Sequence, residues 1–230
     1  MKKVKMASEI FSNKYKNSTK LAIPAAAESL LTPVFQEYRH FLELFNDPDP
    51  IFNSIVEKDI RATHTLSPPL INDFLSLTAP FENLPQYRRV TGMYVTSLIQ
   101  ASHNHGYTRF CLTLDGLQPL HSLCAGLAKH RKQDLCVILE GRAGNFTVAL
   151  TNGGTYFVAD TAADCGIGGR NLILYIGNAT GNIGEHGLLN TIKYYDPSFR
   201  ILGIPARITQ KEWNHEYEAA LQLYREGEIR

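Results

Sequence analysis

Apolar side chains recur at intervals of three and four residues through the first half of the chain. Between Ala25 and Phe45 they lie on one stripe of a predicted helix. This helix ends before Asp47–Pro50, because the residue that precedes a proline avoids the α region. Three further helical segments are predicted, at Ile51–Ile60, Pro69–Leu77 and Gln86–Ala101. The last of them is ambiguous, because it is rich in β-branched residues and because Gly92 weakens a helix.

From Tyr107 onward the pattern changes to short β-type runs that are separated by glycine and asparagine. Each run has the length of a strand, and most are rich in β-branched, aromatic or leucine residues. Glycine adopts positive φ angles at low cost, so the residues between the runs predict repeated sharp corners. The runs are Arg109–Leu114, Leu135–Leu139, Thr155–Val158, Leu172–Ile176, Ile192–Tyr195 and Arg200–Leu202.

The predicted strands recur at a nearly constant interval. Val137 is followed by Tyr156 after 19 positions and by Leu174 after a further 18, while Gly141 and Gly177 are 36 positions apart. A strand-and-corner unit that repeats every 18 to 20 residues or so is typical of a parallel β-solenoid, in which each turn stacks on the previous one. A single turn cannot bury its own inner face, so this fold needs at least about three turns.

The segment from Leu135 to Gly187 resembles the GXGXG domain. This domain is the glycine-punctuated right-handed β-helix at the C-terminal end of the glutamate synthase large subunit, and a similar helix forms a subunit of formylmethanofuran dehydrogenase. The resemblance implies a structural role, in which the β-helix holds neighbouring protein modules in place, and it supplies no catalytic residue. The matching residues are Gly141, Ala143, Gly144, Gly153, Gly154, Gly168, Gly169, Gly177, Asn178, Ala179, Gly181 and Gly184.

The chain departs from the family pattern in three places. Asp160 stands where a corner glycine is expected, and Ala149–Thr151 replaces a Gly-x-Gly corner. The stretch Leu117–Lys132 has apolar residues at helical spacing and interrupts the strand rhythm. These departures predict a short solenoid.

A second interpretation uses part of the same segment. The runs Asn145–Leu150 and Thr155–Asp160 flank Asn152-Gly153, a dipeptide that favours the type I′ turn of an antiparallel hairpin. The fold would then be α+β with an antiparallel or mixed sheet. The sequence leaves open whether residues 145–160 form a hairpin or two solenoid turns.

The composition is that of an ordinary globular protein, with 44% apolar residues, 20% charged residues and a formal net charge of +1. This charge balance predicts no binding to nucleic acid, and no apolar run approaches the roughly 18 residues that a membrane span needs. The Lys-rich first 20 residues lack the apolar core of a secretory signal, so we expect a cytoplasmic location. The four cysteines form no CxxC pair, and we expect neither a metal nor a cofactor.

Histidines are the most visible candidates for chemistry. His103 and His105 would share one face if their segment were a strand, but metal binding needs a third ligand, and a polar loop explains them better. Together with His64 and Asp115 they are the residues that we would place in an active site. The remaining histidines are scattered along the chain, among them His121, His130, His186 and His215.

The other candidates have simpler structural explanations. A carboxylate pair for acid–base catalysis could be built from Asp160 and Asp164, or from Asp115 and Glu140, but a role as corner residues explains these side chains better. Gly166–Gly169 and Gly177–Gly184 lack the spacing of phosphate-binding loops and favour corners. Cys124 lies in an apolar run, where a thiol is a poor nucleophile. Lys129–Lys132 favours the basic end of a helix.

We therefore expect an α+β protein. A mainly helical region with a basic N-terminal arm covers residues 1–106, a short right-handed parallel β-helix covers 107–205, and a capping helix covers 206–230. The capping helix is predicted from Trp213, Tyr217, Leu221 and Tyr224, which lie on one face.

The expected function is that of a non-catalytic structural or scaffold protein of the glutamate synthase β-helix type, which organises partner subunits or self-associates. Whether the protein is an enzyme stays open, and its catalytic residues are unknown. The alternative is a small enzyme with a histidine and carboxylate site between the helical region and the solenoid.

Overall fold

The computed structural model describes residues 25–45, 60–129, 133–184, 186–187, 190–195, 200–201 and 204–228. The chain divides into two units, residues 1–33 and 34–230, and the second contains every described strand. The basic N-terminal arm lies outside the described residues. So does the expected helix over Ile51–Ile60, apart from its last residue, Ile60. Only Lys129 of the basic cluster Lys129–Lys132 is described.

Helices form the first half of the described chain, as the apolar spacing predicts. They are α2 (Ala25–Leu44), α4 (Pro68–Ser76), a short 3₁₀ helix at Ala79–Phe81 and α5 (Tyr87–Asn104), which resolves the ambiguity around Gly92 in favour of a helix. Aromatic rings from three of them meet: the ring centroids of Tyr38 and Phe74 are 5.4 Å apart, and each lies 5.5 Å from that of Tyr94. The Tyr38 hydroxyl is 2.7 Å from Thr91 Oγ1, so its polar end is satisfied inside this core.

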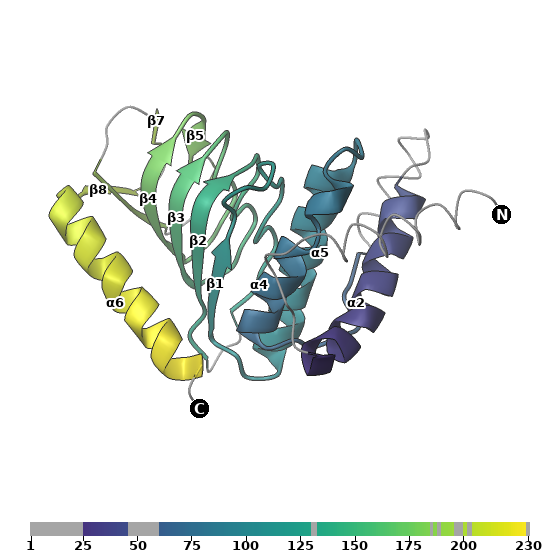
Figure 1. Ribbon diagram of the computed structural model, residues 1–230. Coiled ribbons are helices and arrows are strands. Elements are labelled where there is room, and N and C mark those ends of the chain that lie inside the picture. Colours follow the sequence, from purple (N-terminus) through teal and green to yellow (C-terminus); the bar gives the residue numbers. More distant parts are fainter. Residues whose placement is uncertain are drawn as a thin grey trace. The chain divides into compact units, whose positions relative to one another are not determined.

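The second half forms a parallel sheet. Its six strands pair in the order β1, β2, β3, β4, β6, β8, and every pair is parallel (Figure 1). The α+β architecture is therefore confirmed. The sixth predicted run contributes instead to β7 (Arg200–Ile201), which pairs with β5 (Asn182–Ile183) in a second parallel sheet. The six strands are β1 (Arg109–Thr113), β2 (Cys136–Ala143), β3 (Thr155–Thr161), β4 (Ile173–Ala179), β6 (Thr191–Tyr194) and β8 (Ile204–Arg207).

The register is the one that the spacing predicts. Val137 pairs with Tyr156, and Tyr156 pairs with Leu174. The antiparallel hairpin over residues 145–160 is wrong, because Asn152 bridges in parallel to Ala128 on one side and to Arg170 on the other. The segment before Asn152 cannot be a strand, since it takes a left-handed conformation at every second residue from Phe146 to Leu150.

Left-handed residues recur at matching positions of successive corners. Cys124, Val148, Gly166 and Gly184 have φ angles of 62°, 56°, 69° and 74°. Each of the last three donates its backbone N–H to a carbonyl group of the preceding corner. The predicted helical run Leu117–Lys132 is therefore wrong: alternating left-handed residues exclude an α-helix, and the apolar residues point inward from a corner.

Helix α5 completes the hydrogen bonds of the first corner. Thr96 Oγ1 accepts the N–H of Cys124 at 2.7 Å, and the side-chain amide of Gln100 bonds both the N–H and the carbonyl of Ala128, at 2.8 and 3.3 Å. Gly92 is required at this contact, because a Cβ atom there would lie 1.9 Å from the carbonyl oxygen of His121. The side chains of α5 thus make hydrogen bonds to the first corner of the kind that each later corner makes with the backbone of the corner before it.

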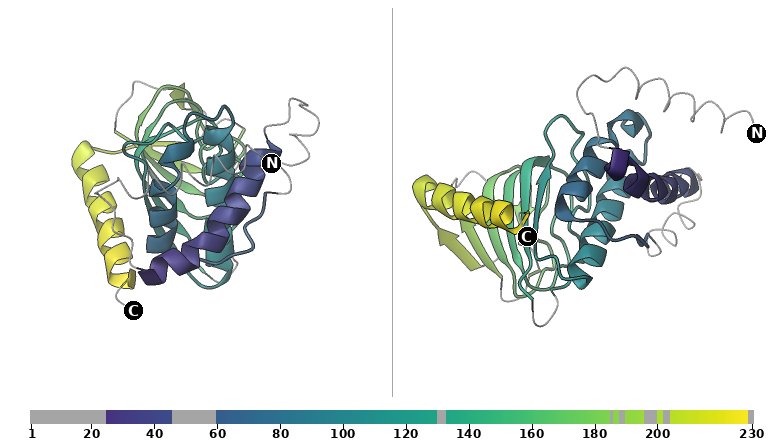
Figure 2. Two further views of the ribbon diagram at one scale, coloured as in Figure 1. Left: turned by 45° about the vertical axis from the view of Figure 1, so that its right-hand side comes forward. Right: turned by 60° about the horizontal axis from the view of Figure 1, so that its bottom comes forward.

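Helix α6 (Gln210–Glu228) lies along the face of the six-stranded sheet (Figures 1 and 2). Trp213 and Leu221 are buried there against a row of residues that crosses four strands: Cys111, Ile138, Phe157 and Tyr175. The C-terminal helix is therefore packed on a face of the sheet. Among the described residues, no helix is long and apolar enough to cross a bilayer.

We predict that Gly177→Ala destabilises the protein by about 1–3 kcal/mol or more, because overpacking of a rigid contact is costly. A Cβ atom at Gly177 would lie 2.4 Å from the carbonyl oxygen of Ala159 on the neighbouring strand. Urea denaturation measures the effect. Gly227→Ala is the control, since its Cβ would meet nothing within 4 Å, and equal stability of the two variants would contradict the close stacking.

We also predict that Thr96→Val costs about 1–3 kcal/mol, because it leaves the buried N–H of Cys124 without its acceptor while the shape of the side chain is kept. The matched control is Thr191→Val, at a half-buried strand residue, and its effect should stay within about 0.5 kcal/mol. Calorimetric unfolding of both variants tests the claim that α5 completes the hydrogen bonds of the first corner. A neutral Thr96→Val would refute it.

Candidate functional site

The two histidines of the candidate pair do not share a face. Both lie at the C-terminal end of α5, where residues two apart point to different sides of the helix. His103 is fully buried with Nδ1 2.9 Å from the carbonyl oxygen of Tyr107, whereas His105 is exposed with Nδ1 2.8 Å from that of Ala101. The polar loop that we expected at His103 is therefore wrong, as is the strand alternative, because α5 extends through His103 to Asn104.

His64 and Asp115 do not complete a site with this pair. His64 is half-buried in the segment that precedes α4, and Asp115 is exposed in the turn that follows β1. His103 contacts Tyr107, just before β1, so the length of that strand, about 16 Å for five residues, separates it from Asp115. The structure thus separates Asp115 from the histidines, whereas the segment of His64 runs beside the end of α5, with Thr65 Oγ1 3.0 Å from His105 Nδ1.

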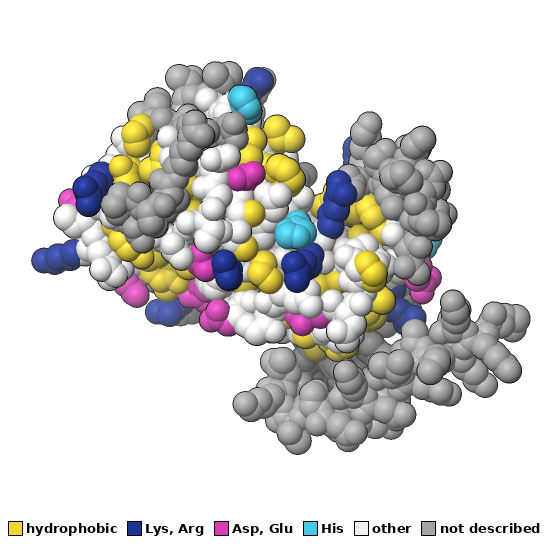
Figure 3. Space-filling view, turned by 90° about the horizontal axis from the view of Figure 1, so that it is seen from above, with side chains coloured by type: hydrophobic (Ala, Val, Ile, Leu, Met, Phe, Trp, Pro, Cys, Tyr) yellow, Lys and Arg dark blue, Asp and Glu magenta, His cyan; other side chains and the backbone are white. Residues whose placement is uncertain are grey.

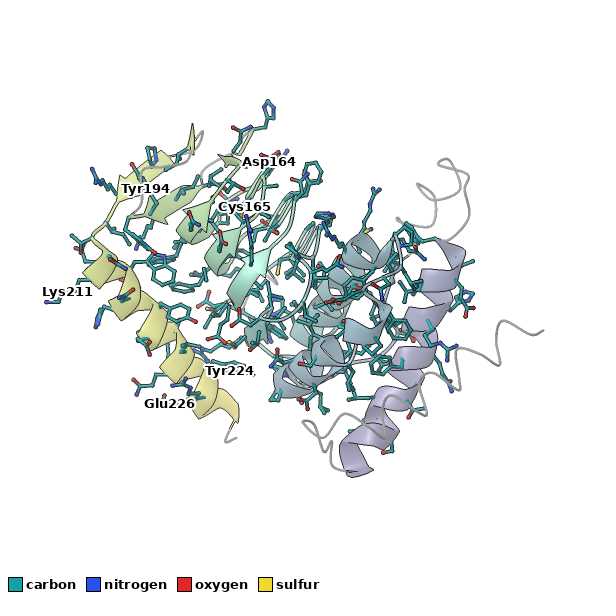
Figure 4. All side chains as sticks on the ribbon, turned by 45° about the horizontal axis from the view of Figure 1, so that its top comes forward. Asp164, Cys165, Tyr194, Lys211, Tyr224 and Glu226 are labelled. Carbon is teal, nitrogen blue, oxygen red and sulfur yellow. The ribbon has the colours of Figure 1, made fainter. Side chains whose placement is uncertain are left out.

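The carboxylates of the two predicted pairs are rearranged. Asp164 Oδ1 accepts the N–H of Asn182 at 2.8 Å, so this side chain supports a corner, and it lies at the strand ends away from α6 (Figure 4). Asp115 is likewise a turn residue. Glu140 and Asp160, one member of each pair, lie on the adjacent strands β2 and β3.

Glu140 is held by residues from a strand and a helix. Thr113 is its partner in the register of β1 and β2, and its hydroxyl donates to Glu140 Oε2 at 3.2 Å. The hydroxyl of Tyr217, from α6, donates to Oε1 at 2.7 Å. Burial, followed by the bond to the Glu140 carboxylate, raises the pKa of Tyr217. The phenol is therefore a donor at neutral pH and links α6 to the sheet.

A second polar row runs across the ends of the same strands. Arg142, Asp160 and Asn178 are neighbours in register, and Arg142 Nε lies 3.3 Å from Asp160 Oδ2. The other oxygen of Asp160 is buried without a hydrogen-bond partner among the described residues. We call Thr113, Glu140, Arg142, Asp160 and Tyr217 the strand-end cluster.

The strand-end cluster consists of two separate groups, Glu140 with Thr113 and Tyr217 and Asp160 with Arg142, which supply two carboxylates, a guanidinium group and a phenol at the ends of β2 and β3. Such groups can bind hydroxyl or amino groups of a ligand and can exchange protons with it. The sequence patterns did not point to Thr113, Arg142 or Tyr217. The register shift between Leu139 and Arg142 explains why the sequence patterns missed Arg142, because the regular 19-residue step would have placed Asp160 opposite Gly141.

The cysteines are poor candidates for nucleophilic chemistry, as expected for Cys124. All four are free thiols. Burial raises the pKa of Cys124 and of Cys165, and it raises the pKa of Cys136 to about 11. Figure 4 shows Cys165 beside Asp164 at the corner after β3.

The glycine runs form corners and strand ends. Gly166 and Gly168 have φ angles of 69° and 64°, and Gly177 packs against the backbone of the preceding strand, β3. Within the described part of the chain, no group of three or more His, Cys, Asp or Glu side chains could hold a metal ion.

Comparisons with known proteins add no relative. No family model matches the chain, no curated protein matches it, and no solved structure matches it.

We predict that Tyr217→Phe lowers the stability by about 1 kcal/mol at neutral pH, because the bond to Glu140 is lost. The raised pKa of Tyr217 gives the sign of the pH dependence. Its contribution is complete below the pKa of an unfolded tyrosine, about 10, and is lost as the pH rises through the higher folded value. Urea denaturation at neutral pH and above about pH 10 measures the difference between the two proteins.

The control for this prediction is Tyr107→Phe, at an exposed tyrosine, which should change the stability little at either pH. A destabilisation by Tyr217→Phe that is the same at both pH values would contradict the assignment of the bond.

Proposed function

We propose that the second half of the chain is a short right-handed parallel β-helix. Three columns of parallel pairing support it: the six-stranded sheet, the bridges Thr147–Cys165–Ile183, and the bridges Ala128–Asn152–Arg170. From β2 to β4, each repeat of 18 or 19 residues adds one segment to every column. Parallel strands joined by crossovers are almost always right-handed, which gives the hand.

The departures from the GXGXG pattern are compatible with this proposal. Asp160 lies within β3 and needs no left-handed conformation. Leu150 does occupy a left-handed corner position, with a φ of 55°, and so keeps the corner without a glycine. The kinship with the glutamate synthase β-helix therefore remains our proposal, and it rests on the glycine positions and on the register.

We propose that the function is structural: the stack presents a surface to partner subunits or to a second copy. One corner supports this most directly. Phe146 and Leu150 are 47% and 72% exposed, and both have left-handed backbones, with φ of 58° and 55°. This conformation costs about 1–2 kcal/mol for a residue with a side chain. The corner itself accounts for this conformation at Leu150, whose N–H donates to the carbonyl of Ile167 at 2.7 Å. It does not account for the exposure of two large apolar side chains, and a contact with another protein is the explanation that we favour.

A second function is favoured by the strand-end cluster. The placement of Glu140, Arg142 and Asp160 toward the ends of the adjacent strands β2 and β3 suits a small enzyme or a ligand-binding module, and Tyr217 of α6 bonds the first of them. The proposal also includes a cytoplasmic location, supported by four free thiols, and no role in binding nucleic acid or membranes, supported by a net charge of +1.

Native mass spectrometry of the protein purified from its own cells tests the structural function. We expect one defined complex or oligomer, and we expect Phe146→Ser/Leu150→Asn to dissociate it without lowering the temperature of unfolding. Leu223→Asn, at an exposed residue of α6, is the matched control and should keep the complex intact. A protein that is monomeric in the native extract, or a complex that survives the double substitution, would refute the proposal.

A further inference from the structure

The dipeptide Asn152-Gly153, whose sequence suggested an antiparallel hairpin, lies instead in a column of parallel bridges. Asn152 is exposed and bridges to Ala128 on one side and to Arg170 on the other. Asparagine before glycine is a sequence prone to deamidation, because glycine has no side chain to shield its backbone nitrogen from the asparagine side chain. The dipeptide is therefore a candidate for chemical modification, and the contacts of its backbone decide whether the reaction occurs.

Backbone hydrogen bonds hold the dipeptide from both sides. The N–H of Asn152 donates to the carbonyl of Leu127 at 2.8 Å, and the carbonyl of Asn152 accepts the N–H of Lys129 at 2.9 Å. On the other side, the N–H of Gly153 donates to the carbonyl of Arg170 at 2.8 Å. The nitrogen that deamidation needs as its nucleophile is thus bonded to the next layer of the stack.

Deamidation requires that this nitrogen be released. Hydroxide removes the proton of the Gly153 nitrogen, which attacks Cγ of Asn152. The new N–C bond closes a succinimide ring, and the bond from Cγ to Nδ2 breaks as ammonia leaves with a proton from water, which restores the hydroxide. Water then opens the ring at either carbonyl and leaves aspartate or isoaspartate at position 152. The attack also needs rotation about the backbone of Asn152, which its pairing on both sides prevents.

We infer that Asn152 is a latent deamidation site, which the hydrogen bond from Gly153 to Arg170 protects and which reacts when these two layers separate. Isoaspartate carries the main chain through its side-chain carbon, which inserts one atom before the nitrogen of Gly153. Pairing on both sides cannot keep its register across an extra atom, so this product cannot stack again. The site turns a reversible opening of the stack into a permanent one, and it does not depend on the proposed structural function.

A buried side chain holds the layer that supplies the Arg170 carbonyl. Asn190 Nδ2 donates to the carbonyl of Gly169 at 2.8 Å, and Asn190 Oδ1 accepts the N–H of Leu172 at 3.4 Å. On the face seen from above, uncharged side chains and backbone make up most of the described surface over the strands (Figure 3). Hydrogen bonds between layers therefore carry much of the stacking, and loss of the Asn190 side chain should let this layer open more often.

Incubation of the full chain at mildly alkaline pH, in water labelled with a heavy oxygen isotope, tests this site with and without urea. Peptide mass spectrometry locates the label and separates aspartate from isoaspartate. We expect conversion of Asn152 to be at least about tenfold slower in the folded protein than in urea, because only opened molecules react. Equal rates in the two states would overturn the inference, and this comparison needs no variant.

The refolding of the aged protein tests the consequence. After removal of urea, molecules with isoaspartate at position 152 should fail to regain the native circular dichroism, whereas Asn152→Asp, which carries the other product, should regain it. Complete refolding of the isoaspartate form would overturn the claim that the opening becomes permanent.

Two variants test the role of the layer that bears Arg170. Asn190→Ala should speed the conversion of Asn152 in the folded protein at least about fivefold. Ser102→Ala is the matched control, because Ser102 is likewise buried and its Oγ bonds both the N–H and the carbonyl of Leu66, in the helical region. It should leave the rate within about twofold. Unfolding curves check that both variants fold, and equal rates in the two would overturn the inference.

Discussion

Parallel stacking requires that the backbone N–H and C=O groups of each layer find partners in the layers on either side. Interior layers satisfy this requirement with one another, but the first and last cannot. At the start, Thr96 and Gln100 of α5 bond the first corner, and Asn72 Oδ1 of α4 accepts the N–H of Thr113 at 2.9 Å. Toward the end, the side chain of Asn190 donates to the carbonyl of Gly169 at 2.8 Å. Helices α4 and α5 thus supply hydrogen-bond partners to β1 and to the first corner.

The other edge of the sheet, strand β8, is protected from further pairing in a different way. Pro205 pairs in register with Ile192 and has no N–H to offer a further strand. Proline on an edge strand discourages the addition of another chain. The two ends of the sheet therefore resist growth by different means, which directs any partner to the corners and faces. This is why the exposed apolar corner at Phe146 and Leu150 is the surface on which the proposed structural role depends.

The same requirement explains which features the sequence predicts. Partners 18 or 19 residues apart follow from spacing alone, and the pairing of Val137, Tyr156 and Leu174 is confirmed. Local patterns predict less well where a corner replaces regular structure. The apolar residues of Leu117–Lys132 imitate a helix because inward-facing positions of a corner also fall three and four apart. The candidate site was hidden for another reason: Tyr217 reaches Glu140 across 77 positions, and no local pattern encodes that contact.

A fixed register also turns a sequence period into columns of neighbouring side chains. Phe157 and Tyr175 are partners in register, and their rings stack with centroids 4.3 Å apart. Lys193 continues the column, with Nζ 2.7 Å from the Tyr175 hydroxyl and 4.6 Å from the centre of its ring. The row of Arg142, Asp160 and Asn178 arises in the same way at the strand ends. Helix α6 covers these columns to different extents. It buries the aromatic column beneath Trp213 and bonds Glu140 through Tyr217, so the strand-end cluster lies at the margin of the covered face.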